Sequence, residues 1–282
     1  MKVRILTAIG IAVLGIPLLV FSQYVVYPIA IGLLCALSAF ELMRVFGMHK
    51  NLFIAIPTYI FTSLLPVFTY RPYFGINTGK FLLYLMLSVF FYLLYLAAVA
   101  VLTRGKLSYA SLSKLFTAVV YITVCFTSMS LLRYMSNGNY LYLLIFVGAW
   151  TCDTFAYFTG RLFGKHKLAP ELSPKKTVEG AIGGVVFTVG GFALYGLIIE
   201  LLPNSNLDAN YLALCLIGLV IAVVAQIGDL FASLIKREHG VKDYSRILPG
   251  HGGILDRFDS ILAVSPVLMV VCALIPPFVA IA

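Results

Sequence analysis

Long hydrophobic runs, separated by short polar segments, follow one another along the chain. A helix of about 20 apolar residues crosses the roughly 30 Å hydrocarbon core of a bilayer. Nine runs have approximately this length: 5–21, 24–46, 52–68, 81–102, 115–135, 140–162, 178–202, 211–235 and 258–280. Lipid offers backbone amides no hydrogen-bond partners, and the runs are too long for barrel strands of about 10 residues. We therefore predict an all-α polytopic membrane protein with nine transmembrane helices.

The composition agrees with this class. Of the 282 residues, 61% are hydrophobic and 11% are charged, whereas about a quarter of the residues in a soluble protein are charged. This balance excludes a disordered chain and a soluble nucleic-acid-binding protein. We expect membrane lipids, and no nucleic acid, among its binding partners.

The distribution of Lys and Arg predicts the orientation. These residues are enriched in cytoplasmic loops. If the N-terminus is cytoplasmic, nine crossings place 17 of the 20 basic residues inside and only Arg71, Lys80 and Arg133 outside. We therefore predict a cytoplasmic N-terminus and an external C-terminus. A cleaved signal peptide is the alternative for 5–21, but no small-x-small cleavage site follows it.

Ionisable residues divide the chain into two parts. Residues 1–139, with the first five helices, carry few of them; Glu41, Arg44 and Arg133 lie near helix ends, where we expect their side chains to snorkel to the interface. We predict that this part is a scaffold and an oligomer interface. Residues 140–282 hold the last four helices and two cytoplasmic loops, 163–177 and 236–257, in which we expect the function.

The acidic residues of the second part point to a polar site. Asp153, Asp229, Asp256 and Asp259 lie within or at the ends of predicted helices, where a carboxylate costs several kcal/mol unless it is partnered. Spacings of three and four residues place several polar side chains on one face of the helix 211–235 and its C-terminal end. These are Gln226, Asp229, Ser233 and Lys236. Such a stripe indicates a polar notch among the helices.

The two loops are rich in cations. Lys165, Lys167, Lys175 and Lys176 belong to the first, and Lys236, Arg237, Lys242, Arg246 and Arg257 to the second. The first could simply contact anionic head groups. The second mixes cations with carboxylates and a flexible Gly252-Gly253 pair, and this combination suggests a polyphosphate held through a hard cation such as Mg²⁺. The sequence contains no P-loop, HExxH or GxSxG motif.

Both loops resemble one enzyme family. The second reads Ser233-x-Ile235-Lys236-Arg237-x4-Lys242-Asp243-x-Ser245-x2-Leu248-Pro249-x-His251-Gly252-Gly253-Ile254-x-Asp256-Arg257-Phe258-Asp259. The first region reads Asp153-xx-Ala156-Tyr157-xx-Gly160-xx-Phe163-Gly164-Lys165, followed by Ser173-Pro174-Lys175-Lys176-Thr177-Val178-Glu179-Gly180. Both are similar to the phosphatidate cytidylyltransferases, or CDP-diacylglycerol synthases, although Val178 stands where Trp is frequent in that family. The resemblance covers residues 140–282; the first five helices match only in being hydrophobic.

The resemblance implies transfer of CMP from CTP to phosphatidate, giving CDP-diacylglycerol and pyrophosphate, with Mg²⁺ required and a second cation left open. It implies that Asp229 and Asp256 hold the metal and that Asp259 supports the site; with Lys242 these form the expected catalytic set. The expected substrate-binding residues are Asp153, Lys175, Lys176, Ser233, Lys236, Arg237, Arg246, His251, Gly252, Gly253 and Arg257.

Within that set, the cations are expected to divide between the lipid phosphate and pyrophosphate, and the His251-Gly252-Gly253 turn to offer backbone N–H groups to phosphates. We further expect a homo-oligomer, as a dimer, in a bacterial inner membrane with the site facing the cytoplasm. Two alternatives stay open at this point. One is a secondary transporter or flippase for an anionic solute, and the other is a CTP-dependent lipid kinase.

Overall fold

The computed structural model describes residues 2–70, 78–103, 107–203 and 205–280; Arg71, expected outside the membrane, is not among them. The chain divides into two compact units. The first comprises Met1–Tyr134 and His239–Arg257, and the second comprises Met135–Glu238 and Phe258–Ala282. Residues 239–257 of the second cationic loop therefore belong to the same unit as the N-terminal helices.

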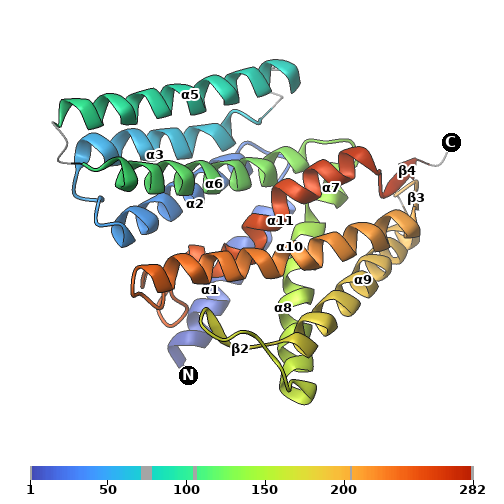
Figure 1. Cartoon of the computed structure of the whole chain (residues 1–282). Coiled ribbons are helices and arrows are strands. Elements are labelled where there is room, and N and C mark those ends of the chain that lie inside the picture. The colour runs from blue at the N-terminus through green and yellow to red at the C-terminus, as the bar shows by residue number, and fades with distance from the viewer. Residues whose placement is uncertain (1, 71–77, 104–106, 204, 281–282) are drawn as a thin grey trace. The chain divides into compact units, whose positions relative to one another are not determined.

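The described residues of the first unit form five long helices. They are α1 (Lys2–Val20), α2 (Val26–Val45), α3 (Leu52–Val67), α5 (Thr78–Leu102) and α6 (Tyr109–Arg133). Helices α3, α5 and α6 lie side by side (Figure 1), and α2 packs against α3 and α6. Met43, Ile54, Leu96 and Leu115 belong to the buried hydrophobic core among these helices. This unit is an apolar helix bundle, and hydrogen bonds to Glu41 on α2 fix the loop 239–257 to it.

The second unit packs its helices around close backbone contacts. It contains α7 (Gly138–Leu141), α8 (Leu143–Phe163), α9 (Val178–Leu201), α10 (Tyr211–Glu238) and most of α11 (Leu255–Leu274), whose first turn belongs to the first unit. Helix α9 packs along both α8 and α10. A side chain at position 180 would block the packing of α9 on α8, because its Cβ atom would lie 2.6 Å from the carbonyl oxygen of Ala156. Glycine therefore sets the distance between α8 and α9.

In the part of the chain that the structure describes, two small antiparallel sheets interrupt the helical pattern. Strands β1 (Lys167–Ala169) and β2 (Ser173–Thr177) form a hairpin between α8 and α9. Strands β3 (Leu207–Ala209) and β4 (Phe278–Ala280) pair at the other end of the second unit. The hairpin is part of the first cationic loop, so strand pairing fixes the positions of the lysines on its two strands.

The helical class is confirmed, and several predicted boundaries are corrected. Seven helices in the described part of the chain are long and apolar enough to cross a membrane, and 6–20 and 52–67 form shorter apolar helices. The last predicted helix ends at Leu274 instead of 280, because Pro276 and Pro277 lack backbone N–H groups. Helix α6 begins at Tyr109 instead of 115. Lys236 and Arg237 lie in the last turn of α10 and not in a loop.

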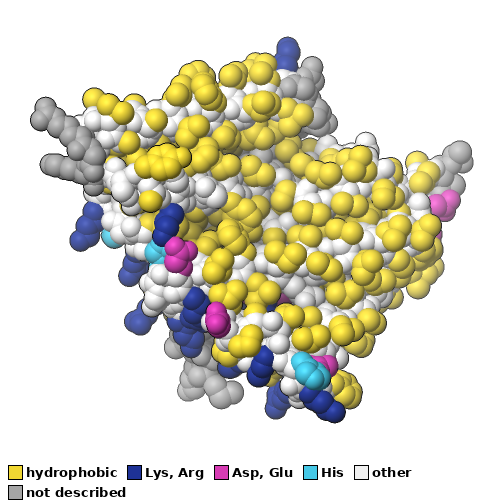
Figure 2. Space-filling model, in the orientation of Figure 1, with side chains coloured by type: hydrophobic (Ala, Val, Ile, Leu, Met, Phe, Trp, Pro, Cys, Tyr) yellow, Lys and Arg dark blue, Asp and Glu magenta, His cyan; other side chains and the backbone are white. Residues whose placement is uncertain are grey.

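The surface separates by polarity. Hydrophobic side chains cover most of the face shown in Figure 2. Leu194 and Leu197 on α9 and Leu216 and Leu219 on α10 are among the exposed hydrophobic residues. Charged side chains gather where α8 ends and α9 begins (Figure 2). The apolar helix faces suit lipid, and the charged end suits the membrane surface.

Candidate active site

Three aspartates of the second unit form a cluster that the sequence predicted in part. Asp153 on α8, Asp229 on α10 and Asp259 on α11 lie within electrostatic range of one another. Lys176 on β2 forms an ion pair with Asp229, with 2.6 Å between Nζ and Oδ2. Ser260 donates a hydrogen bond from Oγ to Asp153 Oδ2 at 3.0 Å. We refer to Asp153, Asp229 and Asp259 as the aspartate cluster. Three helices supply its carboxylates, and β2 supplies the lysine paired with one of them.

The polar stripe on α10 faces the interior of the second unit. Gln226 donates from Nε2 to the carbonyl oxygen of Ala181 on α9, at 3.1 Å. Ser233 and Lys236 are each only 8% exposed, and Lys236 lies within electrostatic range of Asp259. An ammonium group buried beside carboxylates reduces the cost of keeping several of them ionised.

The aspartate cluster is accessible and has the donor chemistry of a hard-cation site. Asp153 is exposed, and Asp229 and Asp259 are half-buried. Carboxylate oxygens are the ligands that Mg²⁺ prefers. Among the residues that the structure describes, no group of three or more His, Cys, Asp or Glu side chains is arranged to hold a metal ion. The fit to Mg²⁺ therefore rests on the oxygen donors, one of which is paired with Lys176.

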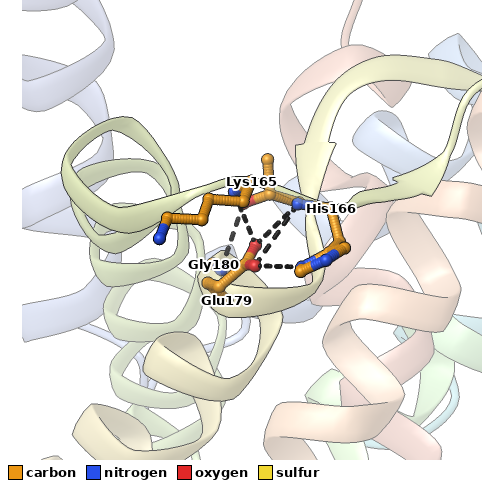
Figure 3. A network of polar contacts seen from close by, with 5 residues as sticks. Lys165, His166, Glu179 and Gly180 are labelled. Carbon is orange, nitrogen blue, oxygen red and sulfur yellow. Dashed lines mark hydrogen bonds and ion pairs between the residues drawn. The ribbon is translucent and has the colours of Figure 1, made fainter.

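A carboxylate in the first turn of α9 fixes the hairpin that carries Lys176. Glu179 accepts hydrogen bonds from the backbone N–H groups of Lys165 and His166, and its Oε1 lies 2.7 Å from His166 Nδ1; Figure 3 shows this network. Thr177 caps α9 by accepting from the N–H of Gly180 at 3.1 Å. The turn after α8 is thereby tied to the start of α9, and the position of β2 follows.

The loop 239–257 of the first unit is held by a second carboxylate. Asp256 Oδ2 accepts hydrogen bonds from the N–H groups of Tyr244 and Gly253, each at 2.9 Å. Gly250 and Gly252 have φ values of 76° and 85°, a left-handed conformation that favours glycine. Asp256 thus closes the loop on itself, and the Gly253 N–H, expected to meet a phosphate, is used within the loop in this structure.

The remaining predicted residues lie on the two loops. Lys242, Arg246 and Arg257 are exposed, and Arg257 donates from Nε to the carbonyl oxygen of His251 at 2.9 Å. The Nδ1 atom of His251 is buried without a hydrogen-bond partner among the described residues.

In the second unit, Lys175 is exposed on β2, and Arg237 donates from Nε to the carbonyl oxygen of Leu172 at 3.4 Å. Each unit therefore carries part of the predicted set.

Three participating residues were not predicted from the sequence. Ser260 has no distinctive signal in an apolar helix. Glu179 was noted in the motif, but its contact with His166 depends on the hairpin. Glu41 was interpreted as a snorkelling residue, and this was wrong, because it is fully buried. Its signal was available, since it is the only acidic residue before Asp153.

The fold and these residues define a class: a helical integral-membrane protein in which carboxylates and cations meet between apolar helices. Sequence comparison makes the class specific. The chain belongs to the cytidylyltransferase family, whose sequence model matches residues 2–275.

Bacterial relatives match over nearly their whole length. A phosphatidate cytidylyltransferase of Bacillus subtilis is 35% identical over 275 residues, covering 97% of this chain and 98% of the relative. One from Staphylococcus haemolyticus is 35% identical over 269 residues, covering 95% and 97%. One from Staphylococcus aureus is 34% identical over 270 residues, also covering 95% and 97%. The similarity thus includes the first five helices and is not confined to 140–282 as the motifs indicated.

Proposed function

We propose that the protein is a phosphatidate cytidylyltransferase, which transfers CMP from CTP to phosphatidate. The observation that carries the proposal is the aspartate cluster paired with Lys176, in a chain whose relatives bear this name. Phosphatidate keeps its acyl chains in the bilayer while its phosphate reaches the surface. A polar cluster between apolar helices is suited to bring that phosphate together with a soluble nucleotide.

The reaction needs alignment more than proton removal. A phosphate monoester with a second pKa near 6 is mostly a dianion at neutral pH. One of its oxygens attacks the α-phosphorus of CTP, forming the new P–O bond, and the bond from the α-phosphorus to the bridging oxygen breaks so that pyrophosphate leaves. Charge accumulates on the departing group, and cations placed there stabilise the transition state. We assign Lys236, Arg237, Lys242, Arg246 and Arg257 to this role and to binding of the lipid phosphate, divided between the two groups.

The carboxylates are the proposed metal ligands. Asp229 and Asp256 would hold Mg²⁺, with Asp259 in support and a second cation left open. Bound Mg²⁺ would neutralise part of the triphosphate charge. Lys176, which is paired with Asp229, would orient that carboxylate and, with Lys175, donate hydrogen bonds to the nucleotide. Asp153 would contact the nucleotide as an acceptor. Ser233, His251, Gly252 and Gly253 are proposed to bind the substrates.

The membrane arrangement is part of the proposal. We infer nine crossings, with the N-terminus in the cytoplasm and the C-terminus outside, in a bacterial plasma membrane. The loops 163–177 and 236–257 then meet CTP on the cytoplasmic side, where it is available. We further propose a scaffold of residues 1–139 with a catalytic part of residues 140–282, and a homodimer.

Labelled CTP tests the reaction directly. The purified protein in detergent is given phosphatidate, Mg²⁺ and CTP labelled on the α- or the γ-phosphate, and label is extracted into the organic phase. Transfer of the α-label supports a cytidylyltransferase. Transfer of the γ-label alone would indicate a lipid kinase, and transfer of neither would favour a transporter.

Matched variants connect the reaction with the aspartate cluster. Asp229→Asn removes a proposed metal ligand and is expected to lower kcat about 100-fold or more. Asp208→Asn changes an exposed aspartate on β3 and is expected to keep the wild-type rate. Equal rates for the two variants would overturn the assignment of Asp229.

A further inference from the structure

Glu41 is a fully buried carboxylate in the first unit, far in sequence from the loop it contacts. It lies near the end of α2 and is 0% exposed. Its Oε1 accepts from Ser245 Oγ at 2.5 Å and from the Ile254 N–H at 2.8 Å. Its Oε2 accepts from the Leu255 N–H at 2.9 Å. Both oxygens therefore act as acceptors for the loop 239–257 and the start of α11.

These hydrogen bonds satisfy buried donors that would destabilise the fold if they had no acceptor. Leu255 is the first residue of α11, and the first N–H groups of a helix have no partner within that helix. Glu41 provides this partner from another helix, which is equivalent to a cap supplied at a distance. Because Ile254, Leu255 and Ser245 are all buried, water cannot easily replace it.

The loop is shaped around this carboxylate. A Cβ atom at position 253 would lie 2.6 Å from Glu41 Oε1, so Gly253 permits the contact. The same glycine donates its N–H to Asp256. Glu41 and Asp256 thus hold one short segment from two directions, despite the repulsion between their charges. A buried anion close to another anion is retained only where strong hydrogen bonds compensate it.

We propose that Glu41 is a positioning residue for the reaction: it fixes the loop 239–257 and the first turn of α11, and so places Asp256. This inference rests on the proposed function. It gives the N-terminal helices a role in catalysis beyond that of a scaffold, and it explains why an acidic residue is kept in an otherwise apolar bundle.

The test replaces the carboxylate by an amide of the same shape. In Glu41→Gln one acceptor oxygen becomes an NH₂ group, which cannot accept from Leu255 or from Ile254 and Ser245, depending on its orientation. We expect kcat to fall about tenfold or more. We also expect amide hydrogen exchange in peptides covering 244–257 to become faster than in the wild type.

Glu200→Gln is the matched control. Glu200 also accepts a backbone hydrogen bond near a helix start, from the N–H of Ala209 at 2.8 Å, and it accepts from Tyr211 Oη at 2.5 Å. It lies at the end of α9 remote from the hairpin. We expect this variant to keep the wild-type kcat and the wild-type exchange in 244–257.

Ser245→Ala provides a second measurement. It removes one donor to Glu41, and we expect a smaller loss of kcat than in Glu41→Gln. In the double variant the two losses should not multiply, because both substitutions disrupt one interaction. If Glu41→Gln does not yield a folded protein, Ser245→Ala alone decides, through lower kcat and faster exchange in 244–257.

The outcomes separate the two proposals. A wild-type kcat in Glu41→Gln, or a lower kcat with unchanged exchange in 244–257, would overturn the positioning role. A wild-type protein that transfers no α-label would overturn the proposed function, while the exchange measurement would still decide whether Glu41 orders the loop.

Discussion

At the scale of single residues, the acids between the helices are partnered in different ways. Asp229 is paired with a lysine, Asp153 accepts from a serine hydroxyl, and Glu41 accepts backbone N–H groups. An ion pair can be exchanged for a substrate or a metal more readily than a backbone cap can, because the lysine side chain is flexible. The Lys176–Asp229 pair is therefore the contact we expect to rearrange when substrate binds.

Lys176→Gln tests that expectation. Loss of the ammonium group removes a charged donor from the aspartate cluster, and we predict that kcat/KM for CTP falls about 100-fold. Lys167→Gln, on the other strand of the hairpin, changes an exposed lysine outside the proposed site and should stay within about twofold of the wild type. Steady-state kinetics on both variants is the measurement, and equal behaviour would contradict the role of Lys176.

The acidic residues that the structure brings together are those whose burial cost is visible in the sequence. Asp153, Asp229 and Asp259 are recognisable because a carboxylate among apolar residues is energetically costly unless it has a partner. That Lys176 pairs with Asp229, and that Ser260 reaches Asp153, depends on helix packing. The interpretation of Glu41 was wrong because its position near a helix end suggested exposure to water, whereas the loop 239–257 covers its carboxylate.

At the scale of elements, α8 and α9 depend on glycine for their close approach. Gly180→Ala would place a methyl group 2.6 Å from the carbonyl oxygen of Ala156, and the backbone of α8 would have to shift. We predict a loss of about 1–3 kcal/mol in the free energy of unfolding. Gly190→Ala, on the same helix with no atom within 4 Å of the new group, should be neutral or stabilise by up to about 1 kcal/mol.

Thermal denaturation in one detergent, followed by the loss of folded protein on size-exclusion chromatography, compares the two glycine variants. Hydrogen exchange of α8 and α9 would show whether the loss in Gly180→Ala lies at this contact. A Gly180→Ala protein as stable as Gly190→Ala would show that the helices separate at little cost, and that glycine is not needed there.

Hydropathy predicted the helices far better than it predicted their ends and connections. A run of apolar residues has one favourable conformation in lipid, which is the helix. The hairpin β1–β2 has no such signal, because Ser173–Thr177 contains two lysines and a proline. The turn before it is held by Glu179, which accepts a hydrogen bond from the Lys165 N–H. The strand β4 lies where prolines end α11.

At the scale of the whole molecule, the number of membrane crossings depends on the two shorter apolar helices, α1 and α3. Nine crossings include α1 and α3, whereas seven would include only the helices of sufficient length and hydropathy. Both versions can keep the N-terminus and the loops 163–177 and 236–257 in the cytoplasm. They differ in the segment 46–51 between α2 and α3, which is cytoplasmic with nine crossings and external with seven.

Lys50→Cys distinguishes the two arrangements. Nine crossings keep Lys50 and the nearby Arg44 inside, in agreement with the distribution of the other basic residues, whereas seven would move both outside. We therefore predict that a membrane-impermeant maleimide added to intact cells does not label Lys50→Cys but labels Asp208→Cys, which lies in a segment external in both arrangements. The native cysteines are buried or half-buried, so the unaltered chain measures the background. If the prediction holds, Lys50→Cys is labelled only after the cells are opened. Labelling of Lys50→Cys in intact cells would contradict it and would show that α3 does not cross the membrane.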